Sequence, residues 1–179
     1  SAAYGNLNVF TFHSNGSVSV DPVFYRPETK GSVDSHLMLF YTAIKRDANE
    51  ILASQNEKTD EKRCVLSKMK DLVTPIREVL STGSNLYQIG TALHQGWLLK
   101  KSITDKISSS NIDEYYERAL SAGALGGKLL GAGGGGFLLL YVEPQNRKAV
   151  IESLSNLYQL PFQFENTGTR ITYYDQLEV

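Results

Sequence analysis

Residues 123–136 have the sequence GALGGKLLGAGGGG and hold eight of the fifteen glycines in this chain of 179 residues. Ordering a glycine costs roughly 0.5–1 kcal/mol relative to alanine, so such a density occurs where side chains do not fit. One cause is the close approach of backbone N–H groups to a ligand, usually a phosphate. The other is tight packing against a neighbouring backbone. The position of this glycine-rich segment, between a helix end and the apolar residues 137–142, favours a ligand-binding loop.

Two common phosphate-binding loops do not fit the segment. Leu129 stands where a P-loop has its magnesium-binding Ser or Thr. Gly131, Gly133 and Gly136 match the letters of the dinucleotide-binding fingerprint, but that fingerprint needs a strand before it and a helix after it. Here the glycines precede a strand, so the dinucleotide-binding fingerprint does not apply. The P-loop is rejected because of Leu129.

The rest of the sequence predicts an α+β fold, with helices packed on a mostly antiparallel sheet. A β-hairpin with a two-residue turn at Asn15-Gly16 opens the chain. A loop that carries Pro22, Pro27 and Gly31 leads to the first buried strand. The expected strands of the sheet are residues 37–41, 137–142, 162–165 and 170–174.

Helices are predicted where apolar residues recur at spacings of three and four. One apolar stripe runs from Val65 to Val79, and Pro75 should kink this helix or start a new turn. A second helix ends at Lys100 and Lys101, whose charges the helix dipole explains. Gly123 ends a third helix, and a last one is expected from residue 144 to about residue 158.

Composition excludes several classes of partner. Eighteen basic and nineteen acidic residues leave a net charge of −1, so no overall field would hold nucleic acid or an anionic membrane. No run of eighteen apolar residues suggests a membrane span. The single cysteine, Cys64, excludes an intramolecular disulfide, and no cysteine–histidine cluster has zinc spacing. We therefore expect a cytoplasmic protein without a metal site, and neither nucleic acid nor membrane as a partner.

The order helix, GGKLLGAGGGG, apolar strand resembles the third conserved motif of the GHMP kinases. Residues 41–48, YTAIKRDA, resemble the strand-to-helix passage of the family's sugar-phosphate branch, and residues 93–102 resemble its helix with a tryptophan and lysines. Residues 1–9 are similar to the segment just after that branch's catalytic acid. The resemblance covers nearly the whole chain and is greatest to members that act on heptose 7-phosphate. Ala43 and Asn6 depart from it, since glycine is expected at both positions.

The resemblance implies a ferredoxin-like GHMP kinase C-terminal domain over residues 31–179. A β-hairpin from the end of the N-terminal kinase domain, residues 1–30, would precede it. The implied reaction is ATP-dependent phosphorylation of the anomeric hydroxyl of a heptose 7-phosphate, with Mg²⁺ neutralising the ATP phosphates.

The same resemblance implies the site residues. Thr42 and Arg46 would hold the phosphate of the sugar, and an exposed helix residue is the alternative for Arg46. Lys128 would either reach a phosphate or cap the preceding helix. The sugar and the transferred phosphate would meet at the backbone of Gly131, Ala132, Gly133, Gly134, Gly135 and Gly136.

The family's catalytic aspartate and its main ATP-binding loop are not found in this sequence. The start of the chain, SAAYG, runs almost at once into an apolar strand, which is typical of a sequence that begins within a domain. We expect the aspartate and the ATP loop upstream of Ser1, in an N-terminal half without which this chain is inactive. The alternatives are another sugar kinase of the family, galactokinase- or fucokinase-like, and a non-catalytic binding module with the same fold.

Overall fold

The computed structural model describes residues 2–173, which form parts of two compact units. One unit contains residues 2–24 and 163–173, and the other is Tyr25–Phe162. The division at residue 24 is near the boundary at residue 30 that the sequence predicts, but it groups residues 163–173 with the hairpin. The assignment of these units to kinase domains stays a prediction.

The smaller unit contains the predicted hairpin. Strands β1 (Asn8–Phe12) and β2 (Val18–Pro22) pair antiparallel, which confirms it. The connection is longer than the expected two-residue turn, because the N–H of His13 donates to the carbonyl of Ser17 at 2.9 Å.

Residues 163–173 join the smaller unit by isolated backbone bonds. Two of them run from Asn6 N–H to Glu165 and from Thr169 N–H to Ala3, each 2.9 Å long. The prediction of strands at residues 162–165 and 170–174 is therefore wrong for the described part of the chain, since these isolated bonds do not form a β-ladder. Residue 174 lies outside the described residues.

The larger unit contains a four-stranded antiparallel sheet in the order β4-β5-β3-β6. Both predicted central strands are present, and the α+β class with helices on an antiparallel sheet is confirmed. The helix expected over residues 144–158 is shorter, because a 3₁₀ turn (Pro144–Asn146) precedes α7 (Arg147–Ser153) and the chain then enters the sheet again. The strands are β3 (Leu37–Tyr41), β4 (Ala124–Leu129), β5 (Phe137–Val142) and β6 (Tyr158–Leu160).

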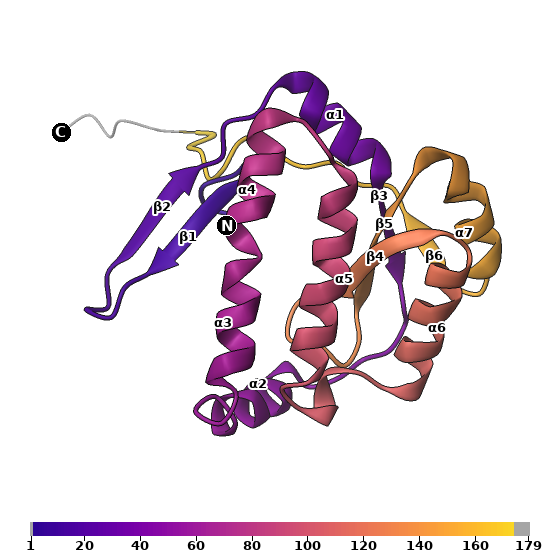
Figure 1. Cartoon of the computed structure of the whole chain (residues 1–179), viewed down its shortest axis with the longest axis horizontal. Coiled ribbons are helices and arrows are strands. Elements are labelled where there is room, and N and C mark those ends of the chain that lie inside the picture. The colour runs from indigo at the N-terminus through magenta and orange to yellow at the C-terminus, as the bar shows by residue number, and fades with distance from the viewer. Residues whose placement is uncertain (1, 174–179) are drawn as a thin grey trace. The chain divides into compact units, whose positions relative to one another are not determined.

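Figure 1 shows the helices of this unit, with α3 and α4 following one another alongside α5. Two expectations are resolved here. Pro27 begins a helix instead of lying in a loop, because proline fits the first helical position. The stripe from Val65 to Val79 is divided at Leu72, and Pro75 lies in the first turn of the new helix. The helices are α1 (Pro27–His36), α2 (Ala48–Glu57), α3 (Arg63–Asp71), α4 (Val73–Thr82), α5 (Tyr87–Lys101) and α6 (Ser110–Ser121).

One face of the sheet carries the core. Phe40 of β3 lies opposite Leu138 of β5, and both side chains are almost completely buried. Tyr116 of α6 and Val150 of α7 pack in the same cluster, so these two helices cover this face, and Trp97 of α5 reaches the cluster as well. Among residues 2–173, no helix is long and apolar enough to cross a membrane.

Helix α5 approaches β4 so closely that only glycine fits between them. A Cβ on Gly126 would overlap the carbonyl oxygen of Gly90 and lie 2.8 Å from the Cβ of His94. The first half of the glycine-rich segment is thus a strand whose glycines serve packing. Helix and strand run in the same direction, since Gly90 lies beside Leu125 and His94 beside Gly126. As a result, the C-terminal end of α5 lies near the second half of the glycine-rich segment.

Candidate functional site

Residues 130–136, here called the glycine loop, connect β4 to β5. The N–H of Leu130 donates to the carbonyl of Phe137 at 2.8 Å and closes the loop. Two of its N–H groups are also used inside the protein. Gly134 donates to Ile107 at 2.7 Å and Gly136 donates to Ile44 at 3.0 Å, so the loop is fixed to two neighbouring segments.

Three carbonyl oxygens of the loop accept hydrogen bonds from side chains of other elements. Lys100 at the end of α5 donates to Gly131 at 2.6 Å, and Gln55 of α2 donates to Ala132 at 3.0 Å. Thr42, after β3, donates to Gly136. These bonds therefore fix the peptide planes that follow Gly131, Ala132 and Gly136.

The remaining N–H groups of the loop are free donors. Within residues 2–173, the N–H groups of Gly131, Ala132, Gly133 and Gly135 donate no hydrogen bond. In a trans peptide the C=O and the following N–H point in opposite directions. The bonds from Lys100 and Gln55 therefore turn the N–H groups of Ala132 and Gly133 away from the side chains that hold the loop. Here the N–H groups of Ala132 and Gly133, which point away from Lys100 and Gln55 respectively, are called the outward N–H groups. Successive free N–H groups in a turn form an anion-binding concavity.

Thr42 has a structural role that the sequence did not predict. Its side chain is buried, and its hydroxyl and its N–H each donate to the carbonyl of Gly136 at 2.9 Å. The hydroxyl oxygen also accepts from the N–H of Ile44 at 3.3 Å. A ligand would have to displace these bonds, and substrate binding by Thr42 stays a prediction.

Arg46 lies beside the glycine loop, just before α2. A Cβ on Gly134 would lie 2.9 Å from the Cγ of Arg46, so the stem of the arginine covers that glycine. The residue is exposed, and no described residue forms an ion pair or hydrogen bond with its guanidinium. The structure thus brings an unpaired cation to the loop. Whether it binds the sugar's phosphate stays a prediction.

Lys128 lies in β4, opposite Leu139 of β5, and not in a loop after a helix. Capping of the preceding helix is therefore wrong as an explanation of Lys128. Lys100 is the residue that sequence reasoning missed. In the sequence, the helix dipole was a sufficient explanation for a lysine at this helix end. Lys100 and Gly131 are 31 positions apart, so no local sequence pattern predicts their contact. The pKa of the Lys100 amine is lowered to about 8, first because burial removes water from it and second because the positive charge of Lys128 is near.

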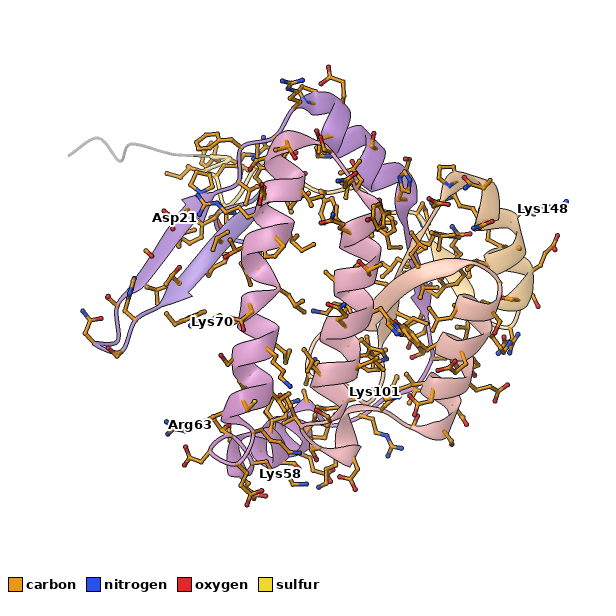
Figure 2. All side chains as sticks on the ribbon, viewed as in Figure 1. Asp21, Lys58, Arg63, Lys70, Lys101 and Lys148 are labelled. Atoms are coloured by element: carbon orange, nitrogen blue, oxygen red, sulfur yellow. The ribbon has the colours of Figure 1, made fainter. Side chains whose placement is uncertain are left out.

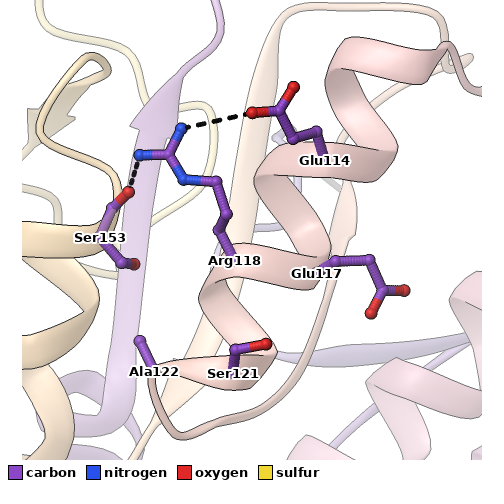
Figure 3. A pocket seen from close by; sticks show the side chains of 6 residues that line it. All are labelled: Glu114, Glu117, Arg118, Ser121, Ala122 and Ser153. Carbon is purple, nitrogen blue, oxygen red and sulfur yellow. Dashed lines mark hydrogen bonds and ion pairs between the residues drawn. The ribbon is translucent and has the colours of Figure 1, made fainter.

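Two other features of the molecule make weaker candidates. A depression of about 480 Å³ between α6 and α7 is lined by Arg118 and five other residues. Figure 3 shows its only basic side chain already occupied, because Arg118 donates to the carbonyl of Ser153 and lies 3.8 Å from a carboxylate oxygen of Glu114. Among residues 2–173, no group of three or more His, Cys, Asp or Glu side chains could hold a metal ion.

Comparisons with known proteins agree with this geometry. Residues 66–160, more than half of the chain, match the family described as GHMP kinases C terminal. The chain is 25% identical over 173 residues to D-glycero-alpha-D-manno-heptose 7-phosphate kinase of Campylobacter jejuni subsp. jejuni serotype O:2. That match covers 94% of this chain and 51% of the relative.

Solved structures show the same fold. A D-glycero-D-manno-heptose 1-phosphate kinase from Bacteroides thetaiotaomicron has a TM-score of 0.67 at 24% identity, over 96% of this chain and 47% of that one. The mevalonate kinase of L. major, in complex with R-mevalonate, has a TM-score of 0.68 at 19% identity, over 90% of this chain and 50% of that one. The chain thus spans about half the length of these proteins. It belongs to the GHMP kinases, and residues 66–160 match the C-terminal domain of that family.

Proposed function

We propose that this chain is the C-terminal portion of an ATP-dependent sugar kinase that phosphorylates the anomeric hydroxyl of a heptose 7-phosphate. The observation that carries the proposal is the glycine loop, in which side chains hold three carbonyls while four N–H groups remain free donors. The choice of sugar is supported by the relative from Campylobacter jejuni, which is a heptose 7-phosphate kinase by name and matches 94% of this chain.

The chemistry of phosphoryl transfer suits such a loop. Negative charge spreads over the oxygens of the transferred group, and catalysis is mostly positioning and charge stabilisation. Donors that are already fixed in place need no reorganisation during the reaction. We assign this role to the outward N–H groups of Ala132 and Gly133. Mg²⁺ would neutralise phosphate charge when bound, and we assign no residue of this chain as its ligand.

Arg46 completes the proposed site on the side of α2. Its exposed guanidinium stands over the loop without a partner among the described residues. A guanidinium binds a phosphate with two parallel hydrogen bonds, which also fixes the orientation of the ligand. We assign Arg46 to the phosphate that the sugar already carries. Orientation at that end would place the anomeric hydroxyl for transfer.

The catalytic aspartate and the main ATP-binding loop belong, in this proposal, to an N-terminal half that acts together with this chain. The relatives are about twice as long as the chain, which supports such a partner segment. The enzyme would work in the cytoplasm, where Cys64, the single cysteine of this chain, stays reduced.

The test compares sugars with the complete protein, obtained by reading the coding sequence upstream of Ser1. ATP consumption is measured with heptose 7-phosphate, galactose, fucose and mevalonate at equal concentrations. The proposal expects the highest kcat/KM with heptose 7-phosphate. A preference for galactose or fucose would assign the chain to the alternative sugar kinases. If the complete protein phosphorylates none of these acceptors, the chain is a binding module and the proposal fails.

A further inference from the structure

Two lysines from different elements meet at the glycine loop. Lys100 ends α5 and its amine donates to the carbonyl of Gly131. Lys128 lies in β4, two residues after Gly126, so both lie on the same face of the strand. That face is the one against which α5 packs at Gly90 and His94. Because α5 and β4 run in the same direction, the last turn of the helix comes to the side of Lys128.

Both ammonium groups lack an acidic partner. No described carboxylate forms an ion pair with Lys100 or Lys128, whereas the neighbouring Lys101 is 2.5 Å from an oxygen of Asp113. The single hydrogen bond of Lys100 goes to a neutral carbonyl. Two like charges that are partly removed from water disfavour one another, and an anion between them would relieve that repulsion.

We propose that Lys100 and Lys128 form a second phosphate subsite, on the side of the glycine loop opposite to the outward N–H groups of Ala132 and Gly133. This inference rests on the proposed phosphate-binding role of the loop. The ligand group is a phosphate carrying two negative charges, and it belongs either to a nucleotide or to a sugar phosphate. On binding, the Lys100 amine keeps its bond to the carbonyl of Gly131 and donates a further hydrogen bond to a phosphate oxygen.

The orientation of the Gly131–Ala132 peptide explains why a phosphate that binds the two lysines needs a subsite of its own. The carbonyl of Gly131 points to Lys100, so the N–H of Ala132 in the same peptide plane points the other way. One phosphate group on the outward N–H groups cannot accept at the same time from the amine in its observed position. A ligand with two phosphate-like groups, or a second ligand, would occupy both sides.

The experiment is a titration of the isotope-labelled chain with pyrophosphate at fixed pH and ionic strength, followed by amide NMR. Variants Lys100→Gln and Lys128→Gln each remove one charge. Lys148→Gln is the matched control, because Lys148 points outward on α7 and only approaches Glu152 at 3.9 Å (Figure 2). A second titration uses heptose 7-phosphate, and melting temperatures of all variants are recorded.

The proposal expects Lys100→Gln and Lys128→Gln each to weaken pyrophosphate or sugar-phosphate affinity about tenfold or more, with Lys148→Gln unchanged. Loss confined to one titration identifies the source of the phosphate. Unchanged affinity in both variants, with amide shifts at Ala132 and Gly133, would overturn this inference and leave the loop's role intact. Lysine-dependent binding without those shifts would overturn the loop's role instead. A lower melting temperature of Lys100→Gln with unchanged affinity would make the bond to Gly131 purely structural, and absence of any binding would overturn both.

Discussion

At the scale of single residues, Gly131 is the loop position where substitution best distinguishes the effect of charge from the effect of backbone conformation. Nothing lies within 4 Å of a Cβ built there, and its φ of +78° is in the left-handed region, which Asn and Asp tolerate better than other residues. We expect Gly131→Asp to weaken pyrophosphate binding about tenfold or more, since a like charge about 6 Å away costs roughly 3 kcal/mol at an effective dielectric constant of 20. Gly131→Asn should bind nearly as well as the wild type.

Calorimetric titration of both variants decides this prediction, with melting temperatures as the check on folding. An equal loss in the two variants would mean that the backbone conformation, and not the charge, matters at Gly131. Gly134 is a poorer probe, although a side chain there would also obstruct the loop. A Cβ on Gly134 would lie 2.6 Å from the Cδ1 of Ile51, so loss of packing and loss of binding would be mixed.

Lys100 gives the subsite a pH dependence. Its pKa of about 8 means that the amine is charged below pH 8 and loses its proton as the pH rises through that value. Affinity for a dianion should therefore be full at pH 7 and fall between about pH 7.5 and 9. Sulfate is the suitable probe, because it does not titrate in this range. In Lys100→Arg the guanidinium stays charged, so the fall should disappear. An identical pH profile in wild type and Lys100→Arg would contradict the assignment.

Arg46 is predicted to bind the phosphate that the sugar carries. A hydrogen bond to a charged group contributes roughly 1.5–3 kcal/mol. Arg46→Ala in the complete enzyme should therefore weaken sugar-phosphate binding about ten- to a hundred-fold, at ~1.4 kcal/mol per factor of ten, while ATP affinity hardly changes. Arg46→Lys should recover part of the loss. Arg63→Ala is the control, because Arg63 is exposed and, within residues 2–173, pairs with Asp60 alone. If ATP and sugar affinities fell equally, Arg46 would not be specific for the sugar.

Much of the site could not be predicted from the sequence at this scale. The glycine run predicted a backbone-lined site, but not which N–H groups are free. That depends on Lys100, Gln55 and Thr42, which reach the loop from distant parts of the chain. Side chains of these types occur at many positions, and only the fold brings these three to neighbouring carbonyls.

At the scale of elements, the contact of α5 with β4 should depend on the absence of a side chain. Gly126→Ala would push the strand from the helix, because the added Cβ would overlap the carbonyl of Gly90. Overpacking typically costs about 1–3 kcal/mol, and overlap with backbone belongs at the upper end of that range. We expect the free energy of unfolding of the larger unit to fall by about 3 kcal/mol, measured by urea denaturation.

Gly31→Ala is the matched control and should act in the opposite direction. Gly31 lies inside α1, and nothing lies within 4 Å of a Cβ built there. Alanine in a helix is favoured over glycine by roughly 0.5–1 kcal/mol, so the unit should become slightly more stable. Equal effects of the two substitutions would show that the α5–β4 contact can relax.

The elements themselves were largely predictable where an apolar pattern was long or strongly β-forming. Residues 37–41 and 137–142 form the two central strands as expected, since both are short apolar runs buried in a sheet. β4 was missed, because glycines hide the alternation that marks a strand. At Gly126 the backbone of α5 occupies the space that a side chain would fill, and a sequence pattern does not predict such a contact.

At the scale of the whole molecule, the chain alone should not consume ATP in the presence of heptose 7-phosphate and Mg²⁺. The described residues supply hydrogen-bond donors and cations around the glycine loop, and in the proposed function these groups bind phosphate and stabilise its charge. Phosphoryl transfer also requires a group that orients the acceptor hydroxyl and a site that holds the nucleotide in line with it. We have assigned both to an N-terminal half, and the relatives that match this chain are about twice its length. The measurement is ATP consumption by the purified chain against a control without protein, followed by addition of the N-terminal half as a separate polypeptide, which should restore activity. Sugar-dependent turnover by the chain alone would contradict the proposed division of labour, provided that Gly131→Asp abolishes it and so excludes a contaminating kinase.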